Sequence, residues 1–213
     1  LTVMLLVDVS NSLDFGTVKQ LKKNMVAEIA ATLAFSAIQN NDKIGVIFFS
    51  DRIEKFIPPK KGRKHILYII RELLDFKPES TRTNIQCAIE YLTNVLKKRC
   101  TAFMLSDFID DRDFQNALTI ANRKHDVVAL QVYDRRLEEL PDVGLMKVRD
   151  AETGHEQWID TSSKSLRKTH HEWWKSRQQK LHEIFTHSNV DAVPVRTDQD
   201  YVKALLNLFA KRN

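Results

Sequence analysis

Five oxygen-bearing side chains stand at positions from which they could hold a metal ion. Asp8, Ser10 and Ser12 alternate in the segment DVSNS, and Thr83 and Asp107 follow later in the chain. The set contains three hydroxyls and two carboxylates, with no nitrogen or sulfur. Such hard oxygen donors select magnesium, calcium or manganese over zinc or copper. The residues therefore predict a divalent-metal site, with magnesium the favoured ion, and no catalytic residues or organic cofactor.

The charge of this set indicates what the metal would do. Two carboxylates roughly neutralise a divalent ion, and if they act partly through water, the direct ligands are mostly neutral hydroxyls. An ion held in this way stays electrophilic and favours one added carboxylate. We therefore expect a partner protein that supplies an acidic residue, and a binding module instead of an enzyme.

The elements that must position these residues alternate between strands and helices. Continuous apolar runs, typical of strands buried on both faces, cover Leu1–Val9, Lys43–Phe49, Thr101–Leu105, Val127–Val132 and Ala192–Val195. Helical patterns cover roughly residues 17–39, 64–75, 84–97, 113–123, 163–187 and 199–211. This alternation predicts an α/β fold with a doubly wound, mostly parallel, six-stranded sheet.

The direction of each strand predicts where the polar residues meet. Ile53–Ile57 follows the preceding strand after a short turn and is stopped by Pro58, so it must pair antiparallel as an edge strand. The metal-site segments then lie at the carboxyl ends of the strands, where open α/β sheets bind ligands. The basic cluster Lys60–Lys64 falls at the opposite end and is interpreted as a solvated surface.

The segment 143–190 is predicted to be an insertion in a single domain spanning residues 1–213. It contains a β-hairpin, Leu145–Arg149 and Glu156–Ile159, around the turn AETG, and then the long helix. Because it leaves a strand that ends on the metal side, the hairpin is expected to flank the metal and influence partner choice. The apolar residues of the helix suit core packing, and its basic face suits solvent.

The bulk composition is that of a soluble globular protein. The 213 residues are 43% hydrophobic and carry a net charge of +5, too small an excess to indicate nucleic-acid binding. The two cysteines have no zinc-ligand spacing and do not indicate a disulfide framework, and the lack of such a framework favours a reducing, cytoplasmic location. No run approaches a membrane span. The chain begins inside an apolar run, so we expect further residues upstream in the natural protein.

The metal-site pattern resembles a known site. Asp-x-Ser-x-Ser after a first strand, a later Thr and a later Asp make up the metal-ion-dependent adhesion site of von Willebrand factor A domains. The runs DVSNSLDFG, GVIFFSDRIEKFIPPKKGRKHIL, FMLSDF and DVVALQVYDRRLEELPDVG are similar to a bacterial domain-of-unknown-function family encoded beside MoxR-type AAA+ ATPases. The resemblance implies a metal-dependent adaptor that works with such an ATPase in the assembly or maturation of other proteins.

Some alternatives stay open at this level. Thr81 competes with Thr83 as the loop ligand. A magnesium-dependent phosphohydrolase of haloacid-dehalogenase type would also begin with a strand-terminal Asp, but it needs a second carboxylate where this chain has Ser10. An RNA-binding A domain would use the basic helix. We also expect Asp107→Ala to leave the domain folded, because Asp107 lies at a strand end.

Overall fold

The computed structural model describes residues 1–16, 20–151 and 153–212. Its strands are β1 (Thr2–Asp8), β2 (Lys43–Phe49), β3 (Ile53–Lys60), β4 (Thr101–Ser106), β5 (Asp126–Tyr133), β6 (Leu145–Arg149), β7 (Glu156–Asp160) and β8 (Asp191–Arg196). Its helices are η1 (Asn11–Asp14), α1 (Lys22–Gln39), α2 (Arg63–Asp75), α3 (Ile85–Val95), α4 (Gln115–Lys124), α5 (Arg135–Glu138), α6 (Lys164–His187) and α7 (Tyr201–Arg212).

Six of the strands form one sheet in the order β3-β2-β1-β4-β5-β8. All neighbouring pairs are parallel except β2 and β3, which pair antiparallel at the edge. The predicted α/β fold and its antiparallel edge strand are therefore confirmed. The strand order reverses between β1 and β4, and Asp8 ends β1 while Asp107 directly follows β4. The two carboxylates thus lie at the topological switch point, where such sheets bind ligands.

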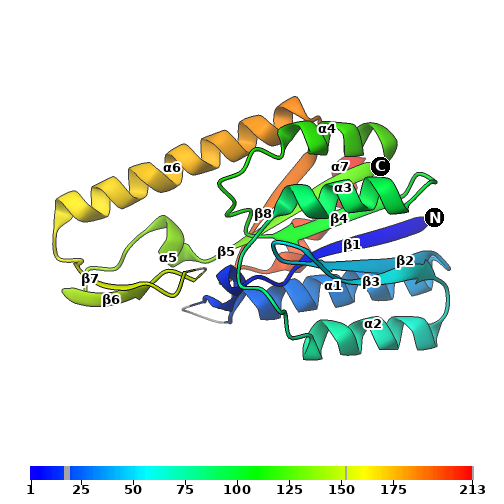
Figure 1. The fold of residues 1–213 in the computed structure, drawn as a ribbon, viewed down its shortest axis with the longest axis horizontal. Coiled ribbons are helices and arrows are strands. Elements are labelled where there is room, and N and C mark those ends of the chain that lie inside the picture. Colours follow the sequence, from blue (N-terminus) through cyan, green and yellow to red (C-terminus); the bar gives the residue numbers. More distant parts are fainter. Residues whose placement is uncertain (17–19, 152, 213) are drawn as a thin grey trace.

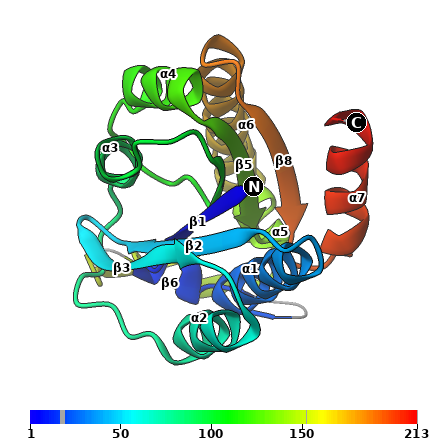
Figure 2. The ribbon, with the colours of Figure 1, turned by 90° about the vertical axis from the view of Figure 1, so that its right-hand side faces the viewer.

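Helices cover both faces of the sheet, which explains the apolar runs. Figure 2 shows α1, α2 and α7 on one side and α3 and α4 on the other. Along β1, Leu5 and Val7 pack into the core beside α1, and Met4 and Leu6 pack into the core beside α3. Since every β1 side chain from Met4 onward is buried, a polar residue is tolerated only at the end of the strand.

The hairpin and the long helix form over the residues predicted for them. Strands β6 and β7 pair antiparallel as a separate two-stranded sheet. Figure 1 shows this hairpin beyond the carboxyl ends of the parallel strands, far from the N-terminus, with α6 returning from it toward α4. Helix α6 begins after Ser163, whose side chain caps Leu166 N–H. Leu181 and Phe185 join the core, whereas Trp173 is 46% exposed.

The edge strand differs from the prediction. β3 continues through Pro58 and Pro59 to Lys60, because an edge strand needs no hydrogen-bond donors on its outer side. The pairing shifts register between Ile44 and Val46. The intervening Gly45 is needed there, since a side chain would collide with Ile57 and Pro59. Lys60, the first residue of the basic cluster, pairs with Ile44 near the start of β2, so the cluster lies at the end of the sheet opposite Asp8, as predicted.

One helix begins later than predicted, and two short helices were not predicted. The first long helix was expected from residue 17; residues 17–19 lie outside the described residues, and the described helix α1 begins only at Lys22. The short helix η1 directly after β1 and the four-residue α5 were not predicted. Both follow the carboxyl end of a strand, and η1 turns Ser12 back toward the site.

Candidate metal centre

Three loops at the switch point bring the five predicted residues together. Shortly after Asp8, Ser10 is the N-cap of η1, and Ser12 lies within η1. Thr83 precedes Asn84, which caps α3 by accepting a hydrogen bond from Cys87 N–H. All five side chains are buried, with relative exposures of 1% for Asp8, 2% for Ser10, 7% for Ser12, 3% for Thr83 and 1% for Asp107.

The three hydroxyls form a compact group around Ser10. Thr83 Oγ1 donates to Ser10 Oγ at 2.9 Å, and the Ser10 and Ser12 hydroxyl oxygens are 3.0 Å apart. Octahedral magnesium holds its oxygen ligands at about 2.0–2.1 Å, which sets adjacent ligand oxygens about 2.8–3.0 Å apart. The hydroxyl spacing therefore fits adjacent corners of such a shell. The competing Thr81 is exposed, which favours Thr83 as the ligand.

Each carboxylate is held by hydrogen bonds from the chain itself. Asp8 accepts from Ser10 N–H at 2.9 Å and from Ser106 Oγ at 2.6 Å. Burial, and then repulsion from Asp107, raise the pKa of the Asp8 carboxyl to about 7. A cation at this site would offset both causes, because it stabilises the ionised form. The donor set and its electrostatics thus fit a hard divalent ion.

Lys22 is a charged residue of the site that the sequence analysis missed. Its Nζ lies 2.6 Å from Oδ2 of Asp107, and the two side chains are 1% and 0% exposed. The second oxygen of Asp107 accepts from Ile109 N–H at 3.0 Å. Two adjacent lysines at a helix start look like surface residues, and only the fold shows that Lys22 turns inward while Lys23 is 55% exposed.

The loop after Asp107 is fixed by polar contacts on both sides. The Asp110 carboxylate accepts from Ile85 N–H at 2.9 Å, and Arg112 donates to the Thr83 carbonyl at 2.6 Å. From α6, Arg177 donates to the carbonyl of Asp110 at 3.2 Å. Phe108 has a positive φ of 55°, a conformation that glycine adopts more easily. These contacts connect the Thr83 and Asp107 loops and hold them in register.

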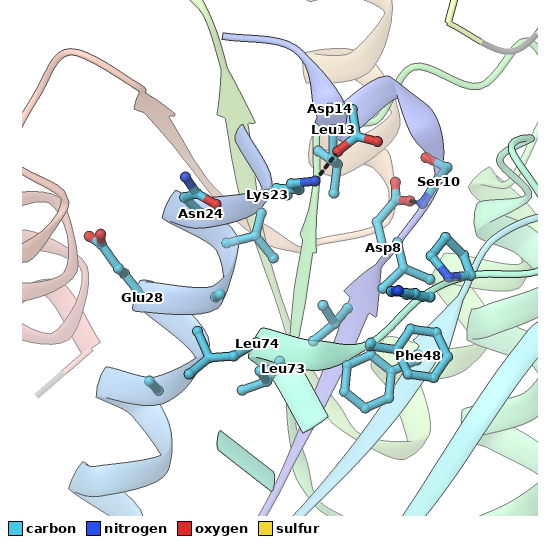
Figure 3. Close-up of a pocket in the computed structure, with 18 of the residues that line it drawn as sticks. Asp8, Ser10, Leu13, Asp14, Lys23, Asn24, Glu28, Phe48, Leu73 and Leu74 are labelled. Atoms are coloured by element: carbon cyan, nitrogen blue, oxygen red, sulfur yellow. Dashed lines mark hydrogen bonds and ion pairs between the residues drawn. The ribbon is translucent and has the colours of Figure 1, made fainter. Parts of the chain in front are cut away.

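Two cavities with different linings reach residues of the site. The larger, of about 900 Å³, is lined by Ser12, Lys22 and Thr83 on one wall and by hairpin residues, Met146 to Ala151, on another. The hairpin therefore lies at the end of the sheet that carries the candidate ligands, where the sequence predicted it. The other cavity, of about 630 Å³, runs between α1 and α2. Figure 3 shows Asp8 and Ser10 toward one end of it and Leu73, Leu74 and Phe48 toward the other.

Other candidate groups in the described residues are few. Within residues 1–16, 20–151 and 153–212, no three His, Cys, Asp or Glu side chains gather in a way that could hold a metal. No described helix has the length and apolarity of a membrane span. Both cysteines are free thiols, and burial raises the pKa of Cys100 to about 12.

Comparison with solved structures finds the same fold in other proteins. Conserved hypothetical protein BatB from Bacteroides thetaiotaomicron superposes with a TM-score of 0.65 at 18% identity, over 99% of this chain and 97% of that one. An aerotolerance-related membrane protein from Bacteroides fragilis gives 0.63 at 18% identity, over 99% and 98%. The SpRpn10 VWA domain gives 0.50 at 11% identity, over 97% and 94%. The fold is therefore von Willebrand factor A-like.

Sequence comparison identifies relatives and a family. Uncharacterized protein Rv1480 of Mycobacterium tuberculosis and Uncharacterized protein Mb1516 of Mycobacterium bovis are each 31% identical over 156 residues, which are 72% of this chain and 49% of theirs. The chain thus matches about half the length of these relatives. A family model described as "Protein of unknown function DUF58" matches residues 1–180. The chain therefore belongs to the DUF58 family, in a domain with a von Willebrand factor A-like fold.

Proposed function

We propose that this domain is a metal-dependent protein-binding module, with a metal-ion-dependent adhesion site formed by Asp8, Ser10, Ser12, Thr83 and Asp107. The observation that carries the proposal is the group of three buried hydroxyls, whose oxygens are 2.9 and 3.0 Å apart, at the same end of the sheet as two buried carboxylates. Magnesium is the favoured ion, and calcium or manganese would suit the same donors.

The residues of the chain prepare this site for a ligand. When bound, the ion supplies an electrophilic position to which a carboxylate of another protein can bind. Ser10, Ser12 and Thr83 offer neutral oxygens, so they do not cancel the charge of the ion. The contacts of Ser10 N–H and Ser106 with Asp8 fix the orientation of that carboxylate, which lowers the cost of ordering it on binding.

The larger cavity is where we place the acidic segment of the partner. Its walls carry the cationic side chains Arg112, Arg136, Lys147 and Arg149, and the acidic Asp110, Asp111 and Asp150. Leu137, Leu140 and Met146 supply apolar surface. The same cavity reaches Ser12 and Thr83. When an acidic side chain of the partner lies at the site, the partner residues next to it would therefore contact the hairpin, and these contacts would select the partner.

We propose a binding module and not an enzyme. A haloacid-dehalogenase mechanism needs a carboxylate two residues after the first Asp, and here the Ser10 hydroxyl contacts Ser12 and Thr83 instead. The RNA-binding alternative needs the basic face of α6, but Arg177 from that helix is 18% exposed and bonded to the loop after Asp107. The hydroxyl at position 10 and the engagement of Arg177 within the chain both favour protein binding at the metal centre over phosphate hydrolysis and RNA binding.

The partner that we propose is a MoxR-type AAA+ ATPase, in line with the sequence resemblance. The domain would act as its adaptor in protein assembly or maturation, in the cytoplasm, where ATP is available and the two free thiols stay reduced. This assignment of partner and location rests on the resemblance, whereas the metal site rests on the geometry above.

The test is a binding experiment between the full-length protein and a MoxR-type AAA+ ATPase of the same organism. We expect association in magnesium that is lost with a chelator and in Thr83→Val. Thr81→Val is the matched control, because Thr81 is exposed two residues away. Association that survives both chelation and Thr83→Val would overturn a metal-dependent contact, and no association in magnesium would overturn the choice of partner.

A further inference from the structure

We propose that Lys22 is a built-in cation that tunes the metal site. It weakens binding of a divalent ion alone and favours binding of the ion together with a carboxylate. The inference rests on the proposed function, because it concerns the same site. Lys22 would thus make the binding of the metal ion depend on the presence of an acidic ligand.

The position of Lys22 is built into the fold. Its Nζ lies 2.6 Å from Asp107 Oδ2 and 5.8 Å from the ring centroid of Phe15. The backbone N–H of Lys22 donates to the Phe15 carbonyl at 2.9 Å, which holds the start of α1 beside Phe15. Gly16 is required at the next position, since a side chain there would collide with the Gln20 carbonyl. These contacts with Asp107 and Phe15 direct the ammonium at the site.

Lys22 also faces the place where a ligand would arrive. It lines the larger cavity together with Ser12 and Thr83. A carboxylate that enters this cavity toward the metal-site hydroxyls would approach the ammonium as well. The adjacent Lys23 points elsewhere and pairs with Asp14 at 2.5 Å on the surface, where the two side chains are 55% and 51% exposed.

The charges of the buried group explain the proposed effect. With both carboxylates ionised, as a bound cation would keep them, Asp8, Asp107 and Lys22 carry a net charge of −1, so a divalent ion alone would bring the group to +1. One further carboxylate would bring it to zero. In a buried site uncompensated charge is costly and charge pairs interact strongly. The lysine therefore penalises the ion alone, and the penalty is relieved when an acidic ligand binds with it.

The experiment is calorimetric titration with Mn²⁺ as the probe, first alone and then in sodium acetate compared with sodium chloride at equal ionic strength. We expect Lys22→Met to bind Mn²⁺ alone on the order of tenfold or more tightly than the wild type does. Acetate should strengthen Mn²⁺ binding to the wild type more than to Lys22→Met. Lys23→Met is the control and should behave as the wild type.

A second variant and a second measurement keep the test interpretable if Lys22→Met is unstable. Lys22→Gln keeps a hydrogen-bond donor near Asp107 without the charge, and it should also bind Mn²⁺ more tightly. In thermal denaturation, Mn²⁺ should raise the Tm of both variants more than that of the wild type, because the ion replaces the missing cation. A variant that folds only when Mn²⁺ is present would agree with the same expectation.

The outcomes separate this inference from the proposed function. If the wild type binds Mn²⁺ and both Lys22 variants bind it equally or more weakly, the role of Lys22 is overturned and the metal site stands. If only the Lys22 variants bind Mn²⁺, the inference is supported in its strongest form. If none of the proteins binds Mn²⁺, both the inference and the metal site are overturned.

Discussion

The Ser106 hydroxyl donates a hydrogen bond of 2.6 Å to Oδ2 of Asp8, across the ends of two neighbouring parallel strands. The same oxygen of Ser106 accepts from Phe108 N–H at 2.9 Å. Ser106 therefore ties the first metal-site carboxylate to the loop that carries the second. It contributes no predicted ligand, and its role is to position Asp8.

Ser106→Ala should weaken both stability and metal binding. Loss of a buried hydrogen bond to a charged group is worth about 1.5–3 kcal/mol, so we expect a decrease of that size in the free energy of unfolding by urea. Mn²⁺ affinity should fall because Asp8 loses its orientation. Ser162→Ala is the control, since Ser162 makes an equivalent bond to Asp160 on the surface. Equal effects of the two substitutions would contradict the positioning role.

Asp107→Ala should destabilise the metal-free domain strongly. The sequence suggested that a strand-end residue could be removed without harm, but Asp107 is buried and paired with buried Lys22. Removing one partner of a buried ion pair costs about 3–5 kcal/mol, because the other charge is left uncompensated. Urea denaturation of Asp107→Ala measures this cost. The double variant Lys22→Met/Asp107→Asn should recover part of it, and a fully stable Asp107→Ala would disprove the argument.

Arg177→Met should loosen the loop after Asp107 from a distance. Arg177 comes from α6 and donates to the backbone carbonyl of Asp110 and to the carboxylate of Asp111. We expect a loss of about 1–3 kcal/mol in unfolding free energy, together with weaker Mn²⁺ binding. Lys175→Met, on the exposed face of the same helix, should change neither. If Arg177→Met matches this control, α6 does not support the site.

Arg149→Glu should affect the partner and leave the metal unchanged. Arg149 lines the larger cavity on the hairpin and is exposed. Reversing an exposed charge at the edge of an interface mainly slows association and alters its salt dependence. We expect several-fold slower association with the ATPase and unchanged Mn²⁺ affinity. Arg63→Glu, at the opposite end of the sheet, is the matched control. An equal effect of Arg63→Glu on association would show that the hairpin is not a contact surface for the partner.

Much of the fold and the predicted ligand set follow from local patterns. The apolar run before Asp8 predicts a doubly buried strand, and the short turn before Ile53 predicts the antiparallel edge; both predictions are confirmed. Lys22 could not be found in this way, because its inward direction depends on the contact of its backbone N–H with the Phe15 carbonyl and on the packing of α1 against the sheet. The continuation of β3 past Pro58 depends likewise on its being an edge strand with a shifted register.

In the metal centre that we propose, Ser10, Ser12 and Thr83 hold a divalent ion with Asp8 and Asp107. The most direct test is calorimetric titration of the wild type, Thr83→Val and Thr81→Val with Mn²⁺. We predict one saturable Mn²⁺ site per chain in the wild type and in Thr81→Val, and its loss or severe weakening in Thr83→Val, with all three proteins folded by circular dichroism. No saturable Mn²⁺ binding to the wild type, or unchanged binding to Thr83→Val, would contradict the metal site.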